Sequence, residues 1–268
     1  MGHGDHWTAL LGSTEKPLVN MLTTTLVEGT LSPVTDEQKQ YQDAHPAENT
    51  FLGIEYGDAP VGCLAVVEKF PEKNKNVLMT AYPFLRDGVP NVLEITDLKT
   101  LPQVCETTGT AVSRAGGVLS FFEPLYFRNR FVLRTGGRYE FSLAAIAYGL
   151  EKLAETEIAV TQGFFLESER ERILKENPDA DVGAVESVAI DVSQLRMLFF
   201  RDDFPEDAEF QTIVEDVEYF RLDGIEICRM PVGFKLGGDR NFRINLYASE
   251  HVLKGYRPQT GDTIIGML

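Results

Sequence analysis

Residues 121–139 interleave aromatic side chains with arginines, in a chain that is otherwise strongly acidic. Aromatic rings on a β surface can stack on the bases of a single-stranded nucleic acid while guanidinium groups contact its phosphates. Tyrosine, phenylalanine and arginine are also enriched at the centres of protein interfaces. The predicted binding residues of this stretch are Tyr126, Phe127, Arg128, Arg130, Arg134 and Arg138.

The same stretch also has a purely structural interpretation. In that interpretation the rings point into a core, and the arginines pair with carboxylates from the acidic half of the same chain. The sequence leaves three alternatives open for it: a structural strand, a protein interface and a single-strand nucleic-acid surface. Because an acidic surface repels nucleic acid, a protein is favoured over nucleic acid as the partner.

Carboxylates gather between residues 202 and 218. The run Asp202, Asp203, Glu206, Asp207 has the hard oxygen ligands that Ca²⁺ or Mg²⁺ prefers, but it lacks the spacing of an EF-hand loop. Glu215, Asp216 and Glu218 suggest paired carboxylates in acid and base roles, and in a strand Asp216 and Glu218 would share one face about 7 Å apart. A solvated loop and the wet face of an antiparallel strand explain these residues more simply. No metal and no cofactor are predicted.

No catalytic motif occurs in the sequence. There is no GxSxG, HExxH, GxGxxG or phosphate-binding loop. His3, Asp5 and His6 have ligand chemistry, but they lie near the chain start, where nothing is predicted to hold them in place. The pattern therefore favours a binding protein over an enzyme and predicts no catalytic residues.

Charge is distributed unevenly along the chain. The formal net charge is −16 over 268 residues. Residues 151–218 hold 19 Asp or Glu against 6 Lys or Arg, a net of −13, whereas residues 101–150 hold 3 against 5, a net of +2. No signal peptide or membrane-length apolar run is seen, so a cytoplasmic protein without membrane contact is expected. Cys63, Cys105 and Cys228 lie among apolar neighbours and are predicted to be buried free thiols.

Glycine turns followed by alternating apolar residues predict a mainly β protein, with antiparallel sheets, a few short helices and room for two small-barrel-like units. Asp223-Gly224 predicts a two-residue hairpin. Residues 167–177 predict a charged helix, and an apolar stripe between Leu143 and Glu155 also has helical spacing. The predicted organisation is a β-rich unit at 1–150, a helical connector at 151–183 and a second β-rich unit at 184–268.

Together these patterns predict a non-enzymatic acidic binding or assembly module that recognises a protein. A basic protein, or another subunit of an assembly, suits the charge of −16 best. The alternatives are a small-barrel binder of single-stranded nucleic acid acting through residues 121–139, and a hydrolase that uses the carboxylates of residues 202–218.

Overall fold

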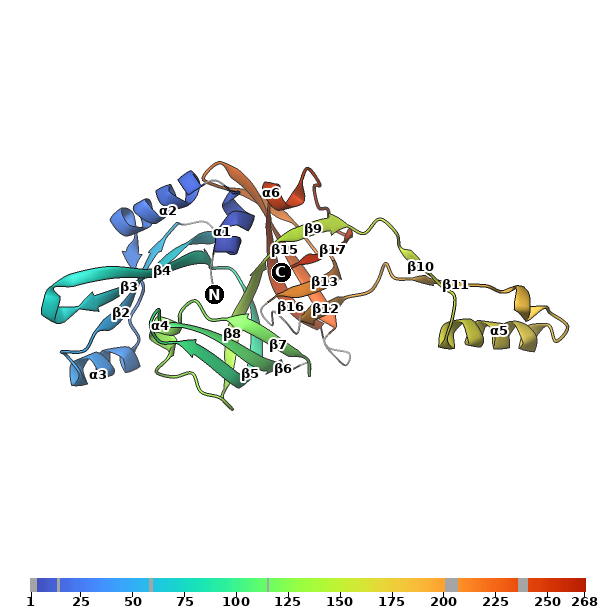
Figure 1. The fold of residues 1–268 in the computed structure, drawn as a ribbon, viewed down its shortest axis with the longest axis horizontal. Helices are drawn as coiled ribbons and strands as arrows, with labels where there is room; N and C mark the ends of the chain where they lie inside the picture. Colours follow the sequence, from blue (N-terminus) through green and yellow to red (C-terminus); the bar gives the residue numbers. More distant parts are fainter. Residues whose placement is uncertain (1–3, 14, 58–59, 115, 201–206, 236–240) are drawn as a thin grey trace.

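The computed structural model describes residues 4–13, 15–57, 60–114, 116–200, 207–235 and 241–268. Over these residues the protein is mainly β, with antiparallel sheets and six short α-helices, which confirms the predicted fold class. The described strands form three larger sheets and a two-stranded ribbon. The ribbon is part of an arm that projects away from the rest of the molecule (Figure 1).

The largest sheet has seven strands in the order β14-β15-β16-β8-β5-β6-β7. These are β5 (Val89–Leu101), β6 (Glu106–Ser113), β7 (Val118–Phe122), β8 (Arg138–Ile146), β14 (Glu218–Leu222), β15 (Ile225–Lys235) and β16 (Asn241–Ser249). Neighbours are antiparallel except β16 and β8, which are parallel. Since β8 belongs to residues 1–150 and β16 to residues 184–268, this sheet takes strands from both predicted β-rich units.

Two further sheets have four strands each, in the orders β1-β2-β3-β4 and β12-β13-β17-β9. The first contains β1 (Thr30–Leu31), β2 (Thr50–Tyr56), β3 (Val61–Phe70) and β4 (Lys75–Leu85). The second contains β9 (Gly149–Lys152), β12 (Met197–Phe200), β13 (Ala208–Ile213) and β17 (Thr263–Met267). Strand β3 is buried from Val61 to Val67. That explains its continuous run of small and apolar residues, because a strand covered on both faces has no polar side.

Five helices accompany these sheets. They are α1 (Gly4–Leu11), α2 (Glu15–Glu28), α3 (Asp36–Ala44), α4 (Tyr126–Asn129) and α6 (Glu250–Leu253). Helix α3 begins at a Thr35 cap, whose hydroxyl accepts the backbone N–H of Gln38. Buried side chains of α1, including Trp7 and Leu10, belong to a large core shared with β15 and β16. A smaller core contains Phe51, Leu64, Val66, Tyr82, Cys105 and Phe127.

The arm consists of residues 157–191. Strands β10 (Glu157–Val160) and β11 (Val188–Asp191) pair antiparallel, and α5 (Phe164–Glu176) and a 3₁₀ turn (Val182–Ala184) lie between them. Helix α5 confirms the charged helix predicted at 167–177, and it begins three residues earlier, after Gly163 with φ +84°. Figure 1 shows β10, β11 and α5 beyond β12 and β13, far from α2 and β4.

Other local predictions had mixed outcomes. Asp223 and Gly224 have φ of +51° and +85° and connect β14 to β15, which confirms the hairpin. Cys63, Cys105 and Cys228 are free and buried, as predicted. The helix predicted between Leu143 and Glu155 is wrong, because residues 143–146 complete β8 and residues 149–152 form β9. No helix among the described residues is long and apolar enough to cross a membrane.

Candidate protein-binding surfaces

The predicted arginine and aromatic residues lie on α4, the loop after it and the start of β8. Phe127 is only 2% exposed and packs in the smaller core, so its ring faces inward. Tyr126 is half-buried against the same core. Of the two predicted aromatic contacts, the structure therefore leaves only Tyr126 partly accessible to a partner.

Three of the four predicted arginines have partners in the first half of the chain. Arg134 donates to the backbone carbonyls of Arg130, Phe131 and Leu133 at 3.0, 2.9 and 2.6 Å, which holds the loop after α4. Arg138 pairs with Glu94 at 2.7 Å, and its side chain remains 70% exposed. The Arg130 guanidinium lies over the rings of Phe51 and Phe131, 5.4 and 4.8 Å from their centroids. A binding role for these arginines stays a prediction.

Glu123 is a buried carboxylate next to this stretch that was not among the predicted site residues. It accepts hydrogen bonds from the backbone N–H of Leu125 at 2.9 Å and from Asn129 Nδ2 at 3.2 Å. Burial raises its pKa, although both hydrogen bonds and the charge of Arg128 act in the opposite direction. The sequence feature that could have pointed to Glu123 is its position as the one acidic residue in the otherwise apolar run Phe121–Tyr126. Its contacts fix the start of α4, so we assign it a structural role.

Of the predicted carboxylates, the structure describes Asp207, Glu215, Asp216 and Glu218, and Asp216 accepts the backbone N–H of Val217 at 2.9 Å. His3 and residues 201–206 lie outside the described residues. Glu215 is held between Arg196, at 3.2 Å, and Arg243, while Glu218 pairs with Arg229. In the described part of the chain, no group of three or more His, Cys, Asp or Glu side chains could hold a metal ion.

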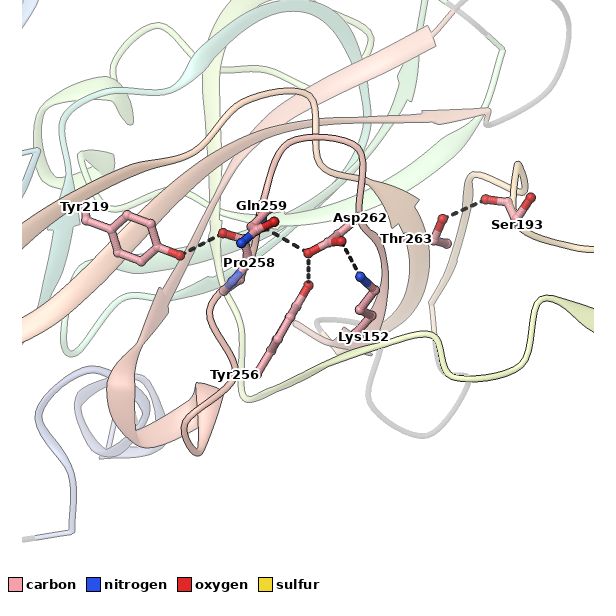
Figure 2. Close-up of polar contacts among 8 residues, drawn as sticks. All are labelled: Lys152, Ser193, Tyr219, Tyr256, Pro258, Gln259, Asp262 and Thr263. Atoms are coloured by element: carbon pink, nitrogen blue, oxygen red, sulfur yellow. Dashed lines mark hydrogen bonds and ion pairs between the residues drawn. The ribbon is translucent and has the colours of Figure 1, made fainter.

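Asp262 is the centre of a polar network between β9 and β17 (Figure 2). Its carboxylate accepts from Lys152 Nζ at 2.6 Å, from the Tyr256 hydroxyl at 2.8 Å and from the Gln259 backbone N–H at 3.0 Å. Partial burial would raise the pKa of Asp262, but these hydrogen bonds outweigh it and lower the pKa. The network fixes the loop that leads into β17, close to the base of the arm.

We expect Asp262→Asn to lower the free energy of unfolding at pH 7 by about 1–2 kcal/mol, because it removes a charge-assisted hydrogen-bond centre. The folded-state pKa of Asp262 lies below its unfolded value. Its stabilisation is therefore present above about pH 4 and lost as the pH falls through the folded pKa. Urea unfolding of wild type and variant between pH 7 and pH 3 should show the difference shrinking. The control variant is Asp97→Asn, at an exposed aspartate. An equally large loss of unfolding free energy in this control, or a loss in Asp262→Asn that stays constant with pH, would contradict the assignment.

The arm exposes large apolar side chains. Phe164 is 78% exposed and Phe165 57%, in the first turn of α5, and Ile158 on β10 is 53% exposed. Leu166, the next residue of the helix, is 2% exposed, so α5 buries one apolar side chain and presents two rings to solvent. Residues 157–191 hold nine carboxylates and three basic side chains, a formal net charge of −6. The arm therefore presents two exposed rings, Phe164 and Phe165, among acidic side chains.

A groove lies on another part of the molecule, between α1, α2, β4 and the connection from β5 to β6. Its volume is about 640 Å³. The lining includes Trp7, Leu18, Leu22, Leu78, Leu101 and Val104. Strand β4 is an edge strand of its sheet, and its residues 78–81 line the groove.

No family model, no curated protein and no solved structure matches this chain.

Proposed function

We propose that this protein is a non-enzymatic assembly module that recognises a protein partner through the arm of residues 157–191. One observation carries the proposal: the adjacent rings of Phe164 and Phe165 are exposed on an element that projects away from the body. Aromatic side chains bury 150–250 Å² each and contribute strongly to interfaces. Contiguous exposed apolar surface of this kind marks interaction sites.

The charge of the arm supports a partner with basic or neutral surroundings. Within α5, Arg170 pairs with Glu167, and Arg172 with Glu169 and Glu176. These exposed pairs contribute little to stability, and the arm keeps its net charge of −6. A partner would cover the two rings and meet acidic side chains around them, which is the usual arrangement of an apolar centre and a polar rim.

The nucleic-acid and hydrolase alternatives have less support. Arg130, Arg134 and Arg138 have partners within the chain, which reduces the cationic surface offered to phosphates. Glu215 and Glu218 are paired with arginines, as structural carboxylates are. Steeply salt-dependent binding of a single-stranded oligonucleotide would favour the first alternative over the proposal.

The proposal is tested by replacing both rings of the arm. Full-length wild type and Phe164→Glu/Phe165→Glu would be immobilised and compared for the proteins that each retains from its native cell extract. We expect retention of the principal partner to fall at least tenfold, because the apolar contact is lost and two carboxylates would have to be buried in its place. Phe199→Glu is the matched control, since Phe199 is 60% exposed on β12 outside the arm. Equal retention by the arm variant and this control would contradict the proposal.

A further inference from the structure

The groove between α1, α2, β4 and the β5–β6 connection is lined by one charged side chain, Glu106. This glutamate is the first residue of β6, and it is only 4% exposed. No lysine or arginine of the described residues lines the groove. The groove therefore combines its other lining residues with one buried carboxylate.

Those other lining residues are mostly apolar. Leu78 of β4 and Leu101 at the end of β5 are 41% and 43% exposed, so both offer hydrocarbon surface to a ligand. Trp7 is almost fully buried, and its indole Nε1 donates to the Ala81 carbonyl at 3.1 Å, which ties α1 to β4. A volume of about 640 Å³ lies within the range of pockets that enclose a small organic molecule.

The carboxylate of Glu106 determines which ligand charge the groove favours. Charges that little water surrounds interact more strongly than exposed charges do, because the local dielectric constant is low. Burial first, and the charge of Glu106 second, raise the pKa of Tyr82 on β4 well above its ordinary value. The field of Glu106 therefore reaches β4, whose residues 78–81 line the groove. A cationic ligand is attracted there and an anionic ligand is repelled.

The charge of the whole chain acts in the same direction. Its formal net value is −16, and a surface of this sign raises the local concentration of small cations. Lysines do occur in the segments around the groove, but they are exposed and do not line it, and water and salt screen exposed charges. They are Lys16, Lys73, Lys75 and Lys99.

We propose that this groove binds a small organic cation, a hydrocarbon chain or ring that carries a protonated amine. The hydrocarbon packs against Leu18, Leu22 and Leu78, and the ammonium group lies beside the Glu106 carboxylate. Such an amine is protonated at pH 7, since its pKa is close to that of lysine, about 10. The groove lies far from the arm, so this site goes beyond the proposed function and does not depend on it.

Three probes with the same hydrocarbon chain and different head groups test the proposal: octylamine, octanol and octanoate. Each is titrated into the full-length protein while the emission of Trp7 is followed, because Trp7 is the chain's single tryptophan and lines the groove. We expect octylamine to bind at least about tenfold more tightly than octanol, because it adds a hydrogen bond between two charged groups. Octanoate should bind most weakly, because its carboxylate meets that of Glu106.

The variant Glu106→Gln removes the charge and keeps the size of the side chain. It should bind octylamine and octanol with similar affinity. Glu72→Gln is the matched control, since it makes the same substitution at an exposed glutamate that does not line the groove, and it should keep the preference for octylamine. Leu78→Asn reduces the apolar wall at a partly exposed position and should weaken the binding of both octylamine and octanol.

Thermal unfolding of every variant shows whether its fold is retained. If Glu106→Gln does not fold, the comparison of the probes on wild type and on Leu78→Asn decides. Three outcomes would overturn the inference: octanol that binds as tightly as octylamine, a folded Glu106→Gln that keeps the preference for octylamine, or a Leu78→Asn variant that binds octylamine as wild type does. A short peptide with one lysine among leucines is the fourth probe. If it binds and octylamine does not, the groove receives a protein side chain and the inference is likewise wrong. The proposed function is tested separately through Phe164 and Phe165, so it stands or fails independently of these results.

Discussion

Replacing Phe127 by alanine is expected to lower the free energy of unfolding by about 3–5 kcal/mol, the usual cost of deleting a buried aromatic ring. The ring is 2% exposed and packs with Phe51, Leu64 and Tyr82. It also fills the space above Gly53, where an added Cβ would lie 2.4 Å from Phe127 Cζ. Neighbours that are locked in strands β2, β3 and β4 cannot collapse into the cavity, so the full penalty should be observed.

Urea unfolding monitored by circular dichroism measures this effect. The matched control is Arg138→Ala, another predicted binding residue, which should change the free energy of unfolding by less than about 0.5 kcal/mol because its ion pair is exposed. A Phe127→Ala variant that lost less than about 1 kcal/mol would show that the ring is not a core residue. With the expected result, any loss of binding in this variant is attributed to unfolding, not to a missing contact.

Replacing Gly266 by alanine is expected to lower the free energy of unfolding by about 1–3 kcal/mol, as overpacking in a core does. An added Cβ would lie 2.2 Å from the Gly149 carbonyl oxygen and 2.8 Å from Phe210 Cζ. The carbonyl belongs to β9, which pairs with β17 and cannot move aside without breaking that pairing. Because β9 is the strand that precedes the arm, the same change should loosen the arm's base.

Gly149→Ala is the matched control for this second change, since an added Cβ at Gly149 would meet nothing within 4 Å. It should leave the free energy of unfolding within about 0.5 kcal/mol of wild type. Hydrogen exchange would report the effect on the arm: amides of β9 and β10 should exchange faster in Gly266→Ala and unchanged in Gly149→Ala. Equal stability of the two variants would contradict the close packing of β17 against β9.

Several features were predictable because their causes are local. Asp223-Gly224 specifies a hairpin, since both residues must adopt positive φ and this pair does so at low cost. The helix of residues 164–176 follows from its charged, helix-favouring composition and from Asn177-Pro178, which cannot continue it. Burial of Cys63 and Cys228 follows from their apolar neighbours.

The segment from Leu143 to Glu155 shows where local pattern is insufficient. Its apolar residues have helical spacing, yet residues 143–146 belong to β8. Pairing decides this, because Leu143 faces Val89 of β5 and Ile146 faces Tyr247 of β16. Those partners lie 54 and 101 residues away in the chain. A periodicity within one segment does not report hydrogen bonds to strands so far away.

The sequence by itself determined the mainly β class, the local turns, the concentration of arginines after Phe121 and the acidic charge of the later half. Only the tertiary structure decided which side chains face solvent. Phe127 and Phe164 are the same residue type, yet one is 2% exposed and the other 78%. Exposure depends on what surrounds a residue in space: Phe127 is enclosed by β2, β3 and β4, whereas Phe164 lies on an arm that nothing else in the described chain covers.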